Sequence, residues 1–528
     1  MGVHLFVHLR LLSAPAGPFQ MSSQTLLNPL RTPAAIPHVL IVGGGLAGTA
    51  VALRLLRDST RPLRISIVEP RAEVGPGLAY STESAAHLVN GLAPFFSLYE
   101  DDPGHFSRWL AEHAEAFGWV PPAGGSTDSS MPPRQLYGRY IQTTLREARQ
   151  QARPGVTLTH VRARVVDLEP QGGHYLLALD DQRTLRADQV VLATGVFGRR
   201  ADRLPFKVDP QVLASPRYVA NPWSPSAWQG VAGEGTVLLL GSGLSALDSL
   251  ISAEQAGFRG RYLALSRRGQ HLQPRRALPP WPDFLQWRPE TLTLRDVLRQ
   301  VRQQRRLLAR QGEDWQRLVP TLRALVAPLW AAASLRDRRR FVNRVRVYWD
   351  VALHRTAPEA LAWQEQAQQQ GRYQHFAGSL EKVDLCADGR LQVHWRDRAS
   401  GEHHEVAVDR VVNCLGFEYD WTKIDDPLIQ RLLCKRLVLL DVLGFGIQAR
   451  RADCRVLDAD ARIQAGLYAI GHPLRGLFWE SNSIPEQVPQ AGLVAKGILQ
   501  ALEAASGPAP TEAATLAPAP ESAELLRA

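Results

Sequence analysis

The stretch that decides the fold is His38-Val-Leu-Ile-Val-Gly-Gly-Gly-Leu-Ala-Gly48, which leads into Thr49-Ala-Val-Ala-Leu-Arg-Leu-Leu56. The apolar run at its start predicts a buried parallel strand, and the residues after the glycines have the composition of a helix. The glycines match G-x-G-x-x-G. In this pattern Gly43 permits a tight turn, Gly45 lets a pyrophosphate approach the backbone, and Gly48 lets the helix pack closely on the strand.

A second apolar strand is expected at Arg64-Ile-Ser-Ile-Val-Glu69, and its carboxylate comes 26 positions (69 minus 43) after the first glycine. An acidic residue there suits the ribose hydroxyls of FAD or NAD, and the free N–H groups of the helix N-terminus suit phosphates. A glycine-rich turn without a nucleotide is the weaker alternative in this context. The residues expected to bind the cofactor in this first unit are Gly43, Gly45, Leu46, Ala47, Gly48, Glu69, Arg71, His87, Asn90, Thr194, Gly195 and Gly471.

The same pattern recurs at Gly235-Thr-Val-Leu-Leu-Leu-Gly-Ser-Gly-Leu-Ser-Ala246, with Ala in the last position of the motif. Its second strand, Arg261-Tyr-Leu-Ala-Leu-Ser266, is followed by two arginines where the first unit has a carboxylate. Hydroxyl and guanidinium groups bind a 2′-phosphate, so NADPH is favoured over NADH, unless the arginines are merely solvated. The residues expected to bind this second nucleotide are Gly241, Gly243, Ala246, Ser266, Arg267 and Arg268.

Composition narrows the class of protein. The net charge of +10 comes from 61 basic and 51 acidic residues spread along the chain, which favours solvated helix faces over a nucleic-acid site. No apolar run is long enough for a membrane span. The cysteines are far apart, without metal or dithiol spacing, which predicts no metal site and a reducing, cytoplasmic setting. These cysteines are Cys386, Cys414, Cys434 and Cys454.

The predicted fold class is α/β, with two Rossmann-like dinucleotide-binding domains and a helical insertion. We expect residues 1–36 to be disordered or an over-extended N-terminus, with Met21 as an alternative start to Met1. The remaining expected parts are the first part of an FAD-binding domain over 37–220, an NAD(P)H-binding domain over 221–420 with the insertion at about 288–356, the C-terminal part of the FAD-binding domain over 421–505, and a disordered tail over 506–528.

Local patterns add detail to this plan. Alternation over Val161–Leu168 predicts a single strand, and the spacing of Thr293 and Asp296 predicts a capping box at the start of the insertion. Near the C-terminus, Gly466–Pro485 leads into a helix from about Glu486 to Ala504. We expect the positive end of that helix to lie at the flavin N1/C2 carbonyl, where it would stabilise the anionic reduced ring.

Four side chains before that helix are candidates for the substrate pocket: Arg475, Trp479, Glu480 and Asn482. A guanidinium could hold an anionic purine, and an indole could stack on its ring. Structural roles for all four are the alternative, and the sequence shows no catalytic nucleophile.

The residues resemble the two-dinucleotide-binding flavoproteins, and more narrowly a bacterial FAD/NAD(P)-binding family. The resemblance extends from Val39 to about Ala504. It rests on Ile41–Ala50, Gly75–Tyr80 with His87–Asn90, Arg339–Asp350 running to Arg355–Pro358, and Gly466–Gly476 with Trp479-Glu480. His472 departs from the apolar residue expected after the glycine of the last block.

Within that family the chain resembles the FAD-dependent urate hydroxylases in length and layout. The resemblance implies an NAD(P)H-dependent monooxygenase in which reduced flavin and O₂ form a C4a-hydroperoxyflavin. That intermediate would convert urate to 5-hydroxyisourate in purine degradation. An N-hydroxylating monooxygenase of an amine such as ornithine or lysine stays open, as does a non-catalytic flavin-binding protein. A disulfide reductase is set aside because the chain has no C-x-x-C.

Overall fold

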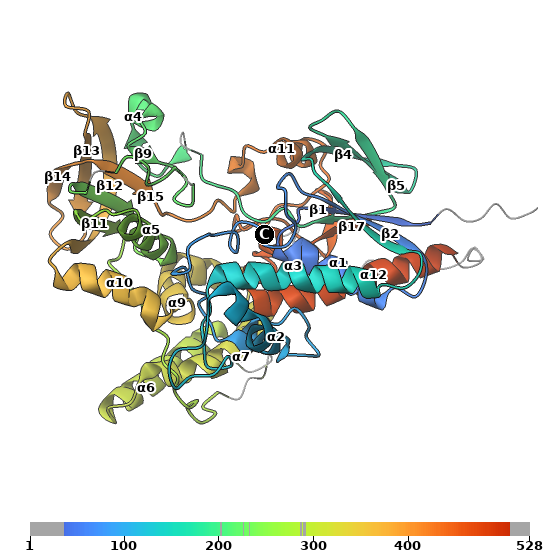
Figure 1. Ribbon diagram of the computed structural model, residues 1–528, viewed down its shortest axis with the longest axis horizontal. Coiled ribbons are helices and arrows are strands. Elements are labelled where there is room, and N and C mark those ends of the chain that lie inside the picture. Colours follow the sequence, from blue (N-terminus) through green and yellow to red (C-terminus); the bar gives the residue numbers. More distant parts are fainter. Residues whose placement is uncertain are drawn as a thin grey trace, which may run out of the picture. The chain divides into compact units, whose positions relative to one another are not determined.

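The first glycine turn follows the strand at the centre of a six-stranded sheet in the computed structural model (Figure 1). The structure describes residues 36–506 except 201–202, 225, 232, 286–287 and 289–291. The expectations for the N-terminal segment, including Met21, and for the C-terminal tail lie outside these residues. The strands of this sheet, in spatial order, are β16 (Arg455–Leu457), β17 (Ile463–Ala469), β7 (Gln189–Leu192), β1 (His38–Val42), β2 (Leu63–Val68) and β3 (Val156–Val161).

The register of this sheet gathers the predicted nucleotide-binding residues at one edge. All of its pairings are parallel except that of β16 with β17. Val42 is paired with Val68 on one side and Leu192 on the other, so the three strands end together. Ligands of open α/β sheets bind beyond the carboxyl ends of the strands. The turn at Gly43, the carboxylate of Glu69 and the segment after β7 therefore share one location.

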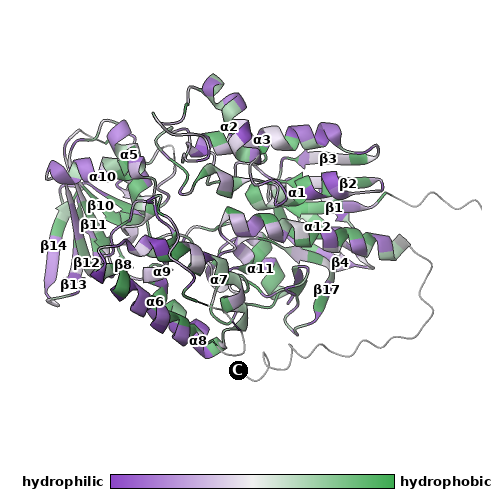
Figure 2. Cartoon of the chain, turned by 90° about the horizontal axis from the view of Figure 1, so that it is seen from below, coloured by the Kyte–Doolittle hydropathy of each residue, from purple (hydrophilic) through white to green (hydrophobic). Residues whose placement is uncertain are grey.

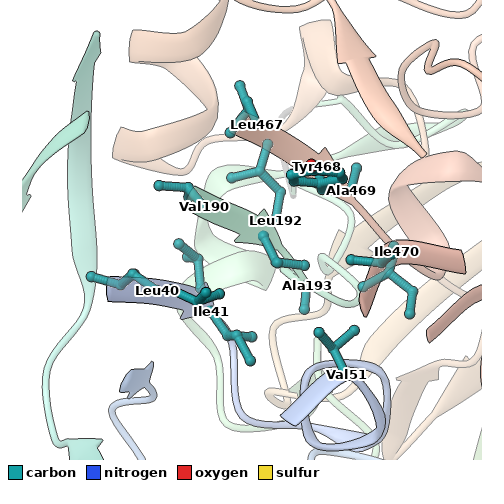
Figure 3. Close-up of a cluster of buried hydrophobic side chains, with 14 of the residues drawn as sticks. Leu40, Ile41, Val51, Val190, Leu192, Ala193, Leu467, Tyr468, Ala469 and Ile470 are labelled. Carbon is teal, nitrogen blue, oxygen red and sulfur yellow. The ribbon is translucent and has the colours of Figure 1, made fainter. Parts of the chain in front are cut away.

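Two helices and an apolar core hold the first glycine turn in place. Helix α1 (Leu46–Asp58) packs along helix α12 (Ile484–Ser506). Beneath them Leu40, Ile41 and Val190 interdigitate with Leu467 and Ile470 at no measurable exposure (Figure 3). Because these strands are buried on both faces, they read as continuous apolar runs rather than as alternating patterns.

A second sheet repeats the arrangement. Leu240 at the end of β10 pairs with Leu265 of β11 and Asn413 of β15, so these parallel strands also end together ahead of helix α5 (Leu244–Gln255). The strands in spatial order are β14 (His403–Val408), β13 (Leu391–Asp397), β12 (Tyr373–Leu385), β11 (Arg261–Ser266), β10 (Thr236–Leu240), β15 (Arg410–Asn413) and β9 (Tyr218–Val219), with β8 (Lys207–Val208) on β12. The α/β class with two Rossmann-like units is confirmed. The domain boundaries stay a proposal.

The expected strand Val161–Leu168 is wrong. Val161 ends β3 of the first sheet, and a new strand starts at Val165 in a separate three-stranded sheet of β4 (Val165–Gln171), β5 (His174–Leu179) and β6 (Thr184–Ala187). The alternating pattern continues across residues 162–164, where the chain changes sheets without a glycine or proline to mark the break.

The remaining helices cover the sheets and form the insertion. The capping box of Thr293 and Asp296 is confirmed at the start of α6 (Leu294–Arg310), which buries only Val297 and Leu308. The rest of α6 is largely hydrophilic (Figure 2), so its arginines form a solvated face. No helix among the described residues has the length and apolar character that a membrane span requires. The other helices are α2 (His105–His113), α3 (Arg134–Gln151), α4 (Pro210–Ala214), α7 (Val319–Ala332), α8 (Leu335–Arg340), α9 (Arg346–Leu353), α10 (Pro358–Gln369) and α11 (Pro427–Cys434).

Candidate functional site

A cavity of about 2330 Å³ is lined by residues that follow the strands of both large sheets. Gly43 and Gly45 of the first turn line it, and so do Gly241 and Gly243 of the second. A pocket for one small ligand is typically about 300–1000 Å³. This cavity therefore has room for two dinucleotides and a small molecule.

The three glycines of the first turn have separate roles, which the structure makes visible. Gly43 has φ +105°, and a Cβ there would lie 2.3 Å from the carbonyl oxygen of Ala193. A Cβ at Gly48 would lie 2.1 Å from the carbonyl oxygen of Gly43, so this glycine serves packing and does not line the cavity. A Cβ at Gly45 would meet only Gly77, at 3.6 Å. Gly45 thus leaves open the face on which a pyrophosphate would approach.

Glu69 ties the end of β2 to this turn. Its carboxylate accepts hydrogen bonds from the backbone N–H of Gly44 at 2.8 Å and of Arg71 at 3.1 Å, and the residue is 8% exposed. A carboxylate has about four acceptor sites. Glu69 lines the cavity, so its two remaining acceptor sites can accept hydrogen bonds from ribose hydroxyls.

The second turn repeats the first with one difference. Gly241 has φ +111°, and a Cβ there would lie 2.8 Å from the carbonyl oxygen of Cys414. Nothing lies within 4 Å of a Cβ placed on Gly243, which therefore faces open cavity. Ala246 is 4% exposed and packs in the core under α5 instead of lining the cavity.

Ser266, Arg267 and Arg268 all line the cavity at the end of β11. The Ser266 hydroxyl lies 3.0 Å from Nε2 of His375. The Arg268 guanidinium donates to the carbonyl oxygen of Asn343 at 3.3 Å. Neither arginine has an ion pair with a carboxylate among the described residues, so both positive charges are available to a phosphate.

The other residues predicted for the first unit lie around the same cavity. His87 is buried, with Nδ1 2.7 Å from the Thr82 hydroxyl and Nε2 3.1 Å from the carbonyl oxygen of Asp248. Burial lowers the pKa of His87, which keeps the ring neutral near pH 7. The predicted residues that line the cavity are Leu46, Ala47, Arg71, His87, Asn90, Thr194 and Gly195.

Gly471 brings the C-terminal segment close to α1. It has φ +77°, and a Cβ there would lie 3.4 Å from Cβ of Ala47 and 3.3 Å from the side-chain amide of Gln487. Gly471 itself does not line the cavity, although His472 and the first turn of α12 do. Burial, and then the charge of Arg475, lower the pKa of His472 to about 3. The imidazole at this departure from the expected apolar residue is therefore neutral.

The four substrate-pocket candidates divide into two pairs. Arg475 and Asn482 line the cavity. The Arg475 guanidinium donates to the Tyr419 hydroxyl, and its Cζ lies 5.1 Å from the centre of the Trp479 ring. Stacking of Trp479 on a substrate is wrong, because that side chain is 2% exposed and packs among Trp330, Phe341 and Phe445.

Glu480 does not face the cavity either. It is 1% exposed, and its Oε1 accepts a hydrogen bond from Nε1 of Trp349 at 2.8 Å. Its Oε2 lies 3.5 Å from Nε2 of His354. Trp479 and Glu480 therefore have structural roles, which is the alternative stated for them above; Trp479 lies against Arg475, and Glu480 holds Trp349.

A buried ion pair joins the two nucleotide units at the cavity. Arg134 at the start of α3 donates to Asp248 of α5 through both terminal nitrogens, at 2.7 and 2.9 Å. The side chains are 18% and 7% exposed. Such a planar two-bond pairing fixes orientation as well as distance. It holds α5 against the segment that carries His87.

The described residues give no sign of dithiol or metal chemistry. Burial raises the pKa of Cys414 and of Cys454 to about 12, so both thiols are inert, and no disulfide forms. Within the described ranges no group of three or more His, Cys, Asp or Glu residues could hold a metal ion.

Sequence reasoning missed several arginines of the cavity wall. Arg275, Arg323, Arg346 and Arg355 all line the cavity. They come from the loop after β11 and from the insertion, whose arginines were interpreted as a solvated face. The only available signal was that two of them fall in the blocks that carry the family resemblance.

Comparisons with known proteins agree with this geometry. Residues 40–197 match the family model described as FAD-NAD(P)-binding. The nitrosuccinic acid synthase of Aspergillus oryzae is 31% identical over 191 residues, which are 34% of this chain and 28% of that protein. The match thus spans little more than a quarter of the relative.

Solved structures share the fold over most of the chain. The ornithine N-hydroxylase of Kutzneria sp. 744, in a structure with reduced FAD, NADP⁺ and L-ornithine, has a TM-score of 0.58 at 15% identity, covering 88% of this chain and 99% of its own. The L-lysine 6-monooxygenase of Pseudomonas syringae has a TM-score of 0.59 at 17% identity, with 88% and 99% covered. Residues 40–197 of this chain therefore form an FAD-NAD(P)-binding domain, and the chain as a whole shares its fold with these two enzymes.

Proposed function

We propose that the chain is an FAD-dependent, NADPH-using monooxygenase that hydroxylates the nitrogen of a primary amine. The observation that carries the proposal is the pair of glycine turns, each at the N-terminus of a helix, that line one cavity with room for a substrate. The overall reaction consumes amine, O₂, NADPH and a proton, and it yields hydroxylamine, NADP⁺ and water.

Each nucleotide has its own set of residues in this proposal. FAD would lie on Gly43, Gly45 and Glu69, where it supplies hydride transfer and O₂ activation when bound. NADPH would lie on Gly241 and Gly243, with its 2′-phosphate held by Ser266, Arg267 and Arg268. The open faces of Gly45 and Gly243 support both placements.

The chain's own task is to position the reactants and exclude water. The buried pair of Arg134 and Asp248 fixes the two units against each other on either side of the cavity. The first turn of α12 lines the cavity, and the helix dipole brings partial positive charge toward the place where negative charge would form.

The similar proteins favour an amine over urate as the substrate. The solved structures with this fold include hydroxylases of ornithine and lysine, and the partial relative is a synthase of nitrosuccinic acid, which carries an oxidised nitrogen. The expectation of urate and of purine degradation finds no support among the proteins reported above. A non-catalytic flavin-binding role leaves the arginine pair after β11 without a purpose.

The proposal is tested with purified protein loaded with FAD. NADPH consumption is followed with and without added amines, and hydroxylamine and hydrogen peroxide are measured as products. We expect an amine to raise NADPH consumption with formation of hydroxylamine, whereas urate should not. Tight FAD binding without reduction by NADPH would contradict the proposal. Stimulation by urate with no hydroxylamine from any amine would contradict it as well.

A further inference from the structure

Three arginines of the cavity wall lie close enough for their charges to act on one another. Arg275 follows β11, Arg323 belongs to α7, and Arg355 follows α9. The backbone N–H of Arg275 donates to the carbonyl oxygen of Thr356 at 2.8 Å, which joins two of the three segments. We call these three residues the arginine cluster.

The arginine cluster has more positive charge than the protein neutralises. Arg323 pairs with Glu486 at 2.9 Å, whereas neither Arg275 nor Arg355 has an ion pair with a carboxylate among the described residues. Arg355 is 6% exposed; its guanidinium donates one hydrogen bond to the side-chain oxygen of Gln316 at 2.7 Å, while its Nε has no hydrogen-bond partner in the described structure. Burying a charge without a counter-charge in contact is costly, so a buried guanidinium whose partner is a neutral amide and whose Nε is unsatisfied indicates room for an anion.

The electrostatics of the cluster agree with this imbalance. Burial lowers the pKa of Arg275 to about 10, with further contributions from the charges of Arg355 and Arg323. The pKa of Arg355 is also lowered, first by burial and then by Arg323. The groups still carry their charges near pH 7, and an anion between them would relieve their repulsion.

The cluster lies beside the segments that the proposed function assigns to the flavin. Nε of Arg275 donates to the carbonyl oxygen of Asn90 at 3.2 Å, and Arg323 donates to the Ser483 hydroxyl at 3.0 Å. Asn90 is among the residues expected to bind the first cofactor, and Ser483 precedes α12. The phosphates of the two nucleotides already have the glycine turns and the arginines after β11. The cluster is therefore left for the substrate.

We propose that the arginine cluster binds the carboxylates of an acidic amino acid, so that the amine hydroxylated here carries two carboxylates instead of a second amino group. The inference rests on the proposed function and narrows its substrate class. Two guanidinium groups that have no carboxylate partner among the described residues match two carboxylates in charge, and a guanidinium can form two parallel hydrogen bonds to one carboxylate. The side-chain ammonium of ornithine or lysine would be repelled by the same groups.

The test separates binding from turnover. Succinate, a dicarboxylate without an amine, is titrated into the FAD-loaded full chain without NADPH, and binding is followed by the flavin absorption spectrum and by thermal unfolding. Ornithine and aspartate are titrated in parallel, and NADPH oxidation with hydroxylamine formation is then measured for each amine. We expect succinate and aspartate to bind and ornithine not to.

Matched variants locate the binding. Arg275→Met and Arg355→Met should weaken succinate binding at least tenfold with an unchanged KM for NADPH. Arg299→Met is the control, because the Arg299 side chain is 67% exposed, pairs with Asp296 and does not line the cavity. If a methionine variant does not fold, Arg275→Lys serves instead. Lysine keeps the positive charge but cannot form two parallel hydrogen bonds to a carboxylate, so Arg275→Lys should weaken succinate binding severalfold.

The outcomes are distinguishable. Succinate binding that needs the cluster, with no amine oxidised, would uphold the anion site and overturn the proposed function. Turnover of ornithine or lysine without binding of any dicarboxylate would overturn the cluster inference and leave the proposed function intact. If Arg275→Met raises the KM for NADPH and leaves succinate binding unchanged, the arginine cluster binds the nucleotide. That result would also overturn the inference.

Discussion

Two glycines of the first turn are predicted to respond differently to alanine: one substitution should weaken FAD binding without loss of stability, and the other should destabilise the protein. Gly45→Ala adds a methyl group whose nearest protein atom is 3.6 Å away, at φ −76°, which alanine adopts freely. The free energy of unfolding of the FAD-free protein should change by less than about 1 kcal/mol. The same methyl occupies the face on which the pyrophosphate approaches, so FAD affinity should fall at least about tenfold, or about 1.4 kcal/mol.

Gly48→Ala should behave in the opposite way. Its methyl carbon would lie 2.1 Å from the backbone oxygen of Gly43, which cannot rotate aside. Overpacking of this kind costs about 3 kcal/mol at the upper end, and the better helix propensity of alanine offsets about 1 kcal/mol. A net loss of about 2 kcal/mol in unfolding free energy follows, and weaker FAD binding follows from the displaced helix.

Two measurements on each variant test this pair. Urea unfolding of the FAD-free protein gives the stability change, and titration of FAD against the intrinsic fluorescence gives the dissociation constant. The reasoning is refuted if Gly45→Ala binds FAD as tightly as the natural protein. It is also refuted if Gly45→Ala loses as much stability as Gly48→Ala, since the open face assigned to Gly45 would then not exist.

Three further predictions follow from the site. R267E/R268E should raise the KM for NADPH at least about tenfold, or about 1.4 kcal/mol, with little change for NADH, and steady-state kinetics with equal effects on both would contradict the 2′-phosphate assignment. Arg134→Met should cost about 3–5 kcal/mol in urea unfolding because Asp248 is left buried and unpaired, and adding Asp248→Met should restore much of it. Cys414, whose pKa burial raises to about 12, should react with a thiol reagent at pH 8 only after unfolding.

The parts of the fold that sequence reasoning reached are those that short segments decide. A glycine turn between an apolar strand and a helix is specified within about 30 residues. The local pattern was therefore enough to predict both turns and their strands. It was also enough to predict that Gly45 and Gly243 face the cavity. The strand error at Val161–Leu168 has the same origin, because an alternating pattern does not reveal that a chain changes sheets.

The cavity wall could not be predicted in the same way. Whether Trp479 faces a substrate or the core depends on Trp330 and Phe341, which lie more than a hundred residues earlier in the chain. Arg275 and Arg355 are brought together by the backbone hydrogen bond from Arg275 to Thr356, which joins two distant segments. Nothing in an arginine-rich helical segment marks which guanidinium turns inward. Tertiary packing decides these orientations, and local periodicity carries no information about them.

The central claim is that both nucleotide turns serve one cavity, so that NADPH bound at the second reduces FAD bound at the first. Anaerobic mixing of the FAD-loaded protein with NADPH tests it most directly. The visible absorption of the flavin should be bleached at a rate that saturates with NADPH, and Gly243→Val should slow bleaching while FAD stays bound. A protein that holds FAD but is not bleached, or bleaching that Gly243→Val leaves unchanged, would contradict the claim.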